Sequence, residues 1–340
     1  MACGDSTIAK VCLSIWRILV RRYGRLFPLS HSLLPRGSKL SLCLPFPLRD
    51  FVSMSRRFCT EVSATCPVEA TTYGYRPDIA GNSFLLAVFG ICTIAQVVLG
   101  IRYKIVAFSI VVAIGCFGET VGYGGRIMMN SNPWDMDGFR MQICCLILSP
   151  SFLAAGIYLT LKHIVLVLGP EKSRLKPRLY TWIFITCDIF SILLQAAGGG
   201  IAASGSGDII NTGNSVMIAG IAFQVATMFV CLVLAADFAF ALFRSKTLRS
   251  DELEKGQPDA TSRKGLYYYL ACFSVAFLAI FVRSIYRLPE MSGGWGNPLM
   301  RNEKEFLILD GAMVALAAVL MTIAHPGIFF PAMRTGSAKN

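Results

Sequence analysis

Hydrophobic and polar positions alternate on a long scale in this chain, as extended apolar runs separated by short polar stretches. A bilayer core about 30 Å thick needs roughly 20 apolar residues per crossing helix. The pattern predicts seven such helices, at about 79–101, 105–128, 140–163, 179–203, 214–243, 266–288 and 306–331. The predicted fold class is therefore all-α, a polytopic membrane protein with a seven transmembrane helix bundle.

Residues 1–72 do not share this pattern. They are basic and rich in Ser, Pro and Arg, and their apolar stretch at 11–20 is too short to cross a bilayer and is broken by Arg17. We expect a disordered tail or leader, followed by a membrane domain at 73–331 and a cytoplasmic tail at 332–340. An organellar transit peptide and a true start at Met54 are the alternatives, so the presence of residues 1–53 in the mature protein stays open.

Basic residues mark one side of the predicted bundle. The first, third and fifth connections are rich in them, whereas the second, fourth and sixth carry few and are balanced by acids. By the positive-inside rule the odd-numbered connections face the cytoplasm. This predicts an N-terminus outside and a C-terminus in the cytoplasm. The basic residues of these odd-numbered connections are Arg102, Lys104, Lys162, Lys172, Arg174, Lys176, Arg178, Arg244, Lys246, Arg249, Lys255, Arg263 and Lys264.

Composition agrees with a membrane protein. The chain is 54% hydrophobic and 15% charged, with a mean hydropathy of +0.58. The net charge is +12, and the basic residues lie in the N-terminal tail and in the short loops between apolar runs. This distribution is typical of residues that set membrane topology rather than of a nucleic-acid-binding surface. Most of the twelve cysteines lie in apolar runs and are interpreted as small hydrophobic residues. Cys59 and Cys66, just before the first span, could pair, and the sequence leaves that open.

The informative residues are polar ones inside the spans. A charged side chain at the bilayer centre costs at least about 2.5–3.5 kcal/mol, so each must face the bundle, a partner or a water cavity. In the second span, Glu119, Tyr123 and Arg126 share one helical face. One interpretation is a polar lining with a protonatable Glu119. The other is a structural carboxylate held by a neighbouring helix, with Arg126 reaching to the membrane surface.

Other spans carry polar residues too. Asp188 and Gln195 are seven residues apart and share a face, and Asp188 is either a functional carboxylate or part of a buried pair. Gln224 is more typical of an interhelical hydrogen bond than of a ligand. The whole candidate polar pathway is Glu119, Tyr123, Arg126, Gln142, Asp188, Gln195, Gln224, Arg283, Arg287, Glu290 and Asp310.

Arg283, Arg287 and Glu290 fall on one face near the end of the sixth span. Two arginines so placed could hold an anionic head group. Alternatively, they form an ion-pair cluster with Glu119, Glu303 or Asp310.

The sequence gives little support for an enzyme. Three histidines are too few and too scattered for a clustered zinc site, and the Gly-x-Ser-x-Gly nucleophile motif is absent. The glycine run at 198–200 lacks the Gly-Lys-Ser/Thr ending of a phosphate-binding loop. We expect no catalytic residues, no metal, no cofactor and no nucleotide.

A recognisable set of residues runs through the membrane region in a fixed order and spacing. It consists of Tyr75-Arg76-Pro77, Asn82, Glu119, Gly122-Tyr123, Arg126, Gln142, Pro150, Ala155, Tyr158, Asp188, Gln195, Gly198-Gly199, Gly220, Gln224, Arg283 to Arg287, Glu290, Glu303, Asp310 and His325-Pro326. The set resembles the fungal RTA-like family, also called the lipid-translocating exporter family. The resemblance implies a seven-span protein, usually at the plasma membrane, with members linked to sphingoid-base export, tolerance of toxic amphiphiles, and porphyrin or haem traffic. The long basic leader departs from the pattern.

The combined hypothesis is an exporter of amphiphilic lipids or toxic compounds of the sphingoid long-chain base type, which confers resistance. Glu119, Asp188 and Asp310 would attract a cationic amine head. The alternative is a seven-span sensor of the lipid-stress response without transport activity. The expected partners are membrane lipids or amphiphilic small molecules, and no nucleic acid. The sequence does not identify protein partners. The expected location is the plasma membrane, with an endomembrane or organellar location as the alternative.

Overall fold

The computed structural model describes residues 59–168, 177–204, 208–244, 263–293 and 296–329. The first 58 residues, the basic stretches at 169–176 and 245–262, and the tail from 330 lie outside this range, so the leader and tail predictions are not tested. Within it, seven helices are long and apolar enough to cross a membrane, which confirms the seven spans and the all-α class. They are Ile79–Tyr103, Val106–Ser131, Met136–Leu166, Leu179–Gly199, Asn211–Ala241, Gly265–Ser292 and Glu303–Phe329.

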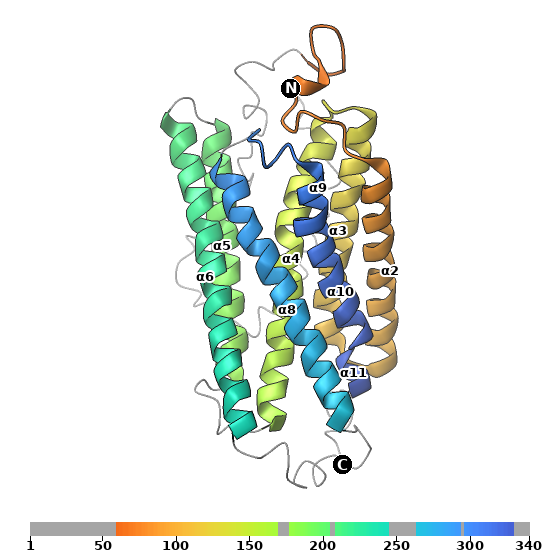
Figure 1. Ribbon diagram of the computed structural model, residues 1–340, viewed down its shortest axis with the longest axis vertical. Helices are drawn as coiled ribbons and strands as arrows, with labels where there is room; N and C mark the ends of the chain where they lie inside the picture. The colour runs from red at the N-terminus through yellow and green to blue at the C-terminus, as the bar shows by residue number, and fades with distance from the viewer. Residues whose placement is uncertain (1–58, 169–176, 205–207, 245–262, 294–295, 330–340) are drawn as a thin grey trace, which may run out of the picture. The chain divides into compact units, whose positions relative to one another are not determined.

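These spans are the helices drawn in Figure 1. The first six are α2 (Ile79–Tyr103), α3 (Val106–Ser131), α4 (Met136–Leu168), α5 (Pro177–Ser204), α6 (Asp208–Arg244) and α8 (Arg263–Ser292). The seventh span is made of four pieces: α9 (Glu303–Glu305), η4 (Phe306–Ala312), α10 (Met313–Ile323) and α11 (Pro326–Phe329). A short 3-10 helix, η1 (Val68–Ala70), precedes them all.

Local signals set the limits of α2. The carboxylate of Asp78 accepts a hydrogen bond of 2.6 Å from the backbone N–H of Gly81, which satisfies one of the free donors at the helix start. At the other end Lys104 adopts a left-handed conformation with φ 57°. Because only Lys104 and Ile105 separate α2 from α3, the two helices are forced to be antiparallel neighbours.

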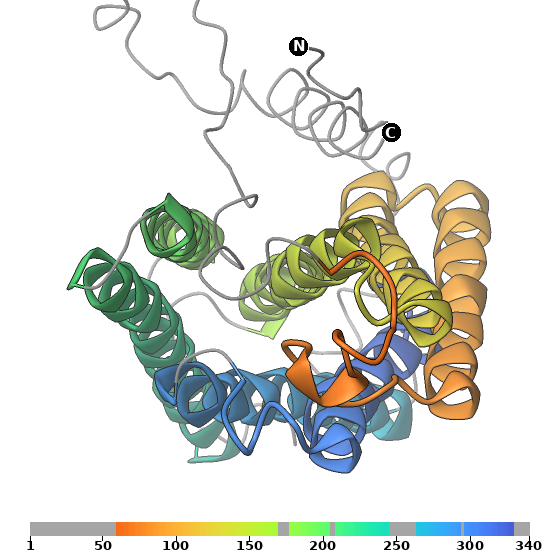
Figure 2. The same cartoon turned by 90° about the horizontal axis from the view of Figure 1, so that it is seen from above.

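The helices pack mainly in pairs around α4. Close contacts join α2 to α3, α5 to α6 and α8 to α10, and α4 contacts both α3 and α5. Figure 2 shows α4 between the α2–α3 pair and the α5–α6 pair. One apolar core runs through the bundle and includes Phe89, Phe108, Phe184, Met228 and Phe273. The buried polar residues described below interrupt this core.

Backbone contact between α3 and α4 depends on glycine. A Cβ atom at Gly125 would lie 2.6 Å from the carbonyl oxygen of Gly138 and 3.0 Å from the backbone nitrogen of Gln142. Since both neighbours are backbone atoms, neither can move aside cheaply. Small residues allow this kind of close helix approach inside membranes.

The start of the seventh span is wider than an α-helix. Residues 306–312 form the π-helical segment η4, which contains Asp310 and Gly311. A Cβ atom at Gly311 would lie 2.6 Å from the Tyr123 hydroxyl, so the segment touches α3 directly. Single π turns of this kind are frequent at functional sites. The hydropathy pattern gives no sign of it.

We expect Gly125→Ala to destabilise the bundle by about 1–3 kcal/mol, because the added methyl group meets backbone atoms. Gly124→Ala is the matched control, since its nearest neighbours would be side-chain atoms at 3.9 Å. Thermal unfolding of the detergent-purified proteins measures the difference. Equal melting temperatures for the two variants would contradict the close α3–α4 contact.

Candidate functional site

All eleven residues of the candidate pathway lie inside the protein, with exposed fractions of 9% or less. Arg126 is fully buried, so the interpretation that it reaches to the membrane surface is wrong. The structure divides the residues into three groups. The central group surrounds Asp310 and extends to Glu290 near the end of α8; its other members are Glu119, Tyr123, Arg283 and Arg287. Arg126 and Gln142 lie towards the end that carries residues 59–78. Asp188, Gln195 and Gln224 lie between α4, α5 and α6.

The central group is built around Asp310. Arg283 donates from Nε to Asp310 Oδ1 at 2.8 Å and from Nη2 to the Leu146 carbonyl at 2.6 Å. Arg287 Nε lies 3.4 Å from the same Asp310 oxygen, and its Nη1 donates to Glu290 Oε2 at 2.6 Å. Both arginines are therefore already held by protein carboxylates. This favours the ion-pair interpretation over an anionic head group.

Glu119 is the exception in this group. It is 1% exposed, and neither carboxylate oxygen has a hydrogen-bond partner among the described residues. The hydroxyl of Tyr123, one helical turn further along α3, also has none, although its ring stacks on Phe89 at 5.7 Å between centroids. Glu119 and Tyr123 thus leave three acceptor oxygens unused in the middle of the bundle.

The charges along this part of the bundle do not balance. The cations are Arg126, Arg283 and Arg287, and the acids are Glu119, Glu290, Glu303 and Asp310. Each arginine makes an ion pair with at least one of the last three acids. When ionised, Glu119 is therefore a surplus negative charge. A buried carboxylate without a counter-charge is expensive in a membrane, so a proton or another cation must neutralise it.

Arg126 forms a second polar site. Its Nε donates to Asn82 Oδ1 at 2.7 Å, and its Nη2 donates to Glu303 Oε1 at 2.7 Å and to the Tyr75 hydroxyl at 3.2 Å. The guanidinium carbon lies 4.3 Å from the Phe306 ring centroid. One side chain on α3 thereby ties together α2, α9 and the segment before α2.

That preceding segment, residues 59–78, is called the cap segment here. A disulfide joins Cys59 to Cys66, which answers the question that the sequence left open. The cap segment is fixed to the turn between α3 and α4, because Asn132 Nδ2 donates to the Thr60 carbonyl at 2.8 Å and Trp134 Nε1 to the Cys66 carbonyl at 3.3 Å. It also reaches α4, where Gln142 Nε2 donates to the Tyr73 hydroxyl at 2.7 Å.

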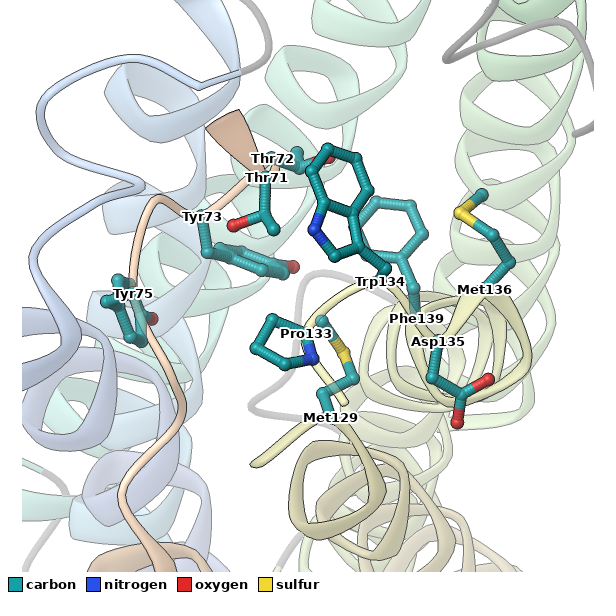
Figure 3. Close-up of a pocket in the computed structure, with 10 residues that line it drawn as sticks. All are labelled: Thr71, Thr72, Tyr73, Tyr75, Met129, Pro133, Trp134, Asp135, Met136 and Phe139. Carbon is teal, nitrogen blue, oxygen red and sulfur yellow. The ribbon is translucent and has the colours of Figure 1, made fainter. Parts of the chain in front are cut away.

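A small pocket lies between the cap segment and the start of α4. Figure 3 shows its largely aromatic and apolar lining. The lining residues are Thr71, Thr72, Tyr73, Tyr75, Met129, Pro133, Trp134, Asp135, Met136 and Phe139. Burial raises the pKa of Tyr73 and of Tyr75 above the usual range, more than the nearby Arg126 lowers it. Both phenols are therefore uncharged at neutral pH.

The third group lies apart from the central one. Asp188 of α5 is 3% exposed, and the hydroxyl of Tyr158 on α4 is its polar neighbour. Gln195 Nε2 donates to Gln224 Oε1 at 3.0 Å, and Gln224 Nε2 donates to Ser151 Oγ at 3.2 Å. The interhelical role expected of Gln224 is thus observed.

Sequence reasoning missed several partners in these groups. Tyr73, Ser151 and Asn297 complete hydrogen bonds to Gln142, Gln224 and the Glu290 carbonyl. Each is a polar residue next to or inside a span, which was the only available signal. Among the described residues, no group of three or more His, Cys, Asp or Glu side chains could hold a metal ion.

The chain is similar to several known proteins. Residues 112–333 match the family model described as RTA1 like protein. The sphingoid long-chain base transporter RSB1 of Saccharomyces cerevisiae (strain ATCC 204508 / S288c) is 35% identical over 289 residues, which cover 77% of this chain and 75% of that protein. Protein RTM1 of Saccharomyces cerevisiae is 28% identical over 64% of this chain and 65% of its own length.

Protein RTA1 of Saccharomyces cerevisiae (strain ATCC 204508 / S288c) is 24% identical over 75% of this chain and 84% of its own length. No solved structure matches the chain significantly. The family model covers more than half of the chain, from within α3 to the end of the seventh span. This chain is an integral membrane protein that belongs to the RTA1-like protein family.

Proposed function

We propose that this protein moves a long-chain amphiphile with a single positive charge, of the sphingoid-base type, across the membrane. The observation that carries the proposal is the unpaired, buried carboxylate of Glu119 near Arg283 and Arg287, two arginines that already hold Asp310 and Glu290. A bundle with one surplus negative charge at mid-membrane is suited to a cargo with one positive charge.

The hydrogen-bonding capacity of the site fits a primary amine. An alkylammonium group has three N–H donors and no acceptor. The two oxygens of Glu119 and the hydroxyl oxygen of Tyr123 are buried acceptors without partners. We assign the amine head to these two residues, which together are called the head site. Arg283, Arg287, Glu290 and Asp310 position the site and are neutralised among themselves.

The relatives support the same class of cargo. A protein named as a sphingoid long-chain base transporter is 35% identical to this chain over most of both lengths. Movement of such a lipid breaks no covalent bond of the cargo, so the proposed activity is non-enzymatic. Resistance to toxic amphiphiles would follow from their removal from the inner leaflet.

The cap segment supports the proposed orientation. Disulfides persist in oxidising compartments, and the Cys59–Cys66 pair therefore favours an extracytoplasmic cap segment. The basic odd-numbered connections favour the same arrangement. We propose that the cap segment lies outside, the C-terminus lies in the cytoplasm, and the protein resides in the plasma membrane.

We expect Glu119→Gln to reduce transport of a labelled sphingoid base about tenfold or more, because the charge-assisted hydrogen bond to the amine is lost. Purified protein in liposomes measures this directly. The same substitution should leave the melting temperature unchanged or raise it, since it removes a surplus buried charge without breaking an ion pair. The matched control is Asp137→Asn, whose carboxylate side chain is 74% exposed.

Three outcomes would contradict the proposal. Unchanged transport by Glu119→Gln would remove the head site, and a large loss of stability would show that Glu119 is structural. Saturable binding of the base by the wild-type protein without movement across the vesicle membrane would favour the sensor interpretation instead.

The orientation is tested with thiol chemistry on intact cells. After an impermeant reductant, a membrane-impermeant thiol reagent should label the wild-type chain more strongly than a Cys59→Ser/Cys66→Ser double variant. The double variant accounts for labelling of the other cysteines. Equal labelling of the two proteins before and after reduction would place the cap segment on the other side.

A further inference from the structure

A second buried carboxylate, Asp188, is not explained by the head site. It lies near the middle of the span Leu179–Gly199 and is 3% exposed. The polar group that acts on its carboxylate is the hydroxyl of Tyr158 on α4, which is itself uncharged. An acid at this depth without a cationic partner must be neutral or must meet a cation for part of its working cycle.

The groups around Asp188 differ from those around Glu119. Tyr158 faces it from α4, Cys231 from α6, and Cys187 is its neighbour on α5. All three are uncharged groups, and no charged side chain of the described residues acts on Asp188. Glu119, by contrast, lies within the influence of Arg283, Arg287 and Asp310. A proton is therefore the simplest counter-charge for Asp188.

Asp188 also lies at a boundary between packed units. A Cβ atom at Gly220 would lie 3.0 Å from the backbone nitrogen of Gln195, so α5 and α6 are in backbone contact. The Gln195–Gln224 hydrogen bond of 3.0 Å joins the same two helices. Towards α4, the pair presents Asp188 opposite Tyr158 and the Gln224–Ser151 hydrogen bond.

This position links the charge on Asp188 to helix packing. With a proton, Asp188 is neutral and can remain beside the Tyr158 hydroxyl and the thiols. Without it, the carboxylate favours water or a cation, which requires the α5–α6 pair to separate from α4. Proton binding and release would then favour two different arrangements of the same interface.

We propose that Asp188 is a proton-carrying site that couples transport to a proton gradient, with one proton moving inward for each ammonium moved outward. The exchange is electroneutral, because a single positive charge crosses in each direction. The inference rests on the proposed function, since it assumes the ammonium cargo at Glu119. In this proposal Asp188 carries the proton, whereas Glu119 binds the amine.

The experiment compares wild-type protein, Asp188→Asn and protein-free liposomes with a labelled sphingoid base. Transport is measured first at equal pH on both sides and then under an imposed pH gradient. Protein-free liposomes report how far the gradient redistributes the amine without protein. We expect equal-pH exchange by Asp188→Asn within about twofold of wild type, while the stimulation by the gradient falls to the protein-free level.

A second measurement does not depend on the variant. A pH-sensitive dye trapped inside wild-type liposomes should report proton movement when the base is added at equal pH, beyond that seen without protein. Absence of this signal would overturn the proposal even if Asp188→Asn cannot be purified. Asp188→Glu keeps the carboxylate and should keep the gradient response.

Other outcomes separate the two proposals. Equal gradient stimulation in wild type and Asp188→Asn would overturn proton coupling at Asp188 and leave the head site intact. Loss of equal-pH exchange in Asp188→Asn would also overturn it, because Asp188 would then be needed for movement itself. If wild-type protein gives no exchange at all, the proposed function fails and not merely the coupling.

Discussion

The structure depends on how the bundle neutralises charge away from water. Arg283 and Arg287 converge on Asp310 from α8, and Arg287 also holds Glu290 within the same helix. Removing one member of such a network would leave an uncompensated charge, which costs far more than the network itself contributes. The position of η4 against α8 is thereby fixed by electrostatics as well as by packing.

The spans and the buried polar residues were predictable because both follow from the cost of placing polar groups in hydrocarbon. Helical periodicity indicates which residues share a face, as for Glu119 and Tyr123, but it does not identify the partner on another helix. For this reason the pairing of Arg126 with Asn82 and Glu303 was not predicted. The grouping of Asp188 with Glu119 was expected from function alone, and the structure separates the two residues.

Other features had no signal in the hydropathy pattern. The cap segment has no helical periodicity, so its contacts from Tyr73 to Gln142 and from Tyr75 to Arg126 depend on tertiary structure. The glycines of α3 could be recognised as small residues, but only the structure shows which of them touch backbone. The π-helical segment likewise depends on an extra residue within a turn, and ordinary side chains give no indication of it.

The wide turn at Asp310 has a geometric consequence for the rest of its span. Conversion of η4 into regular α geometry would expel one residue from the turn, and the helix on one side would rotate by about 100° relative to the other. Such a rotation would carry the Asp310 carboxylate out from between two guanidinium groups with little translation along the membrane normal. The π-helical hydrogen bonding of η4 therefore keeps the Asp310 carboxylate between the two guanidinium groups.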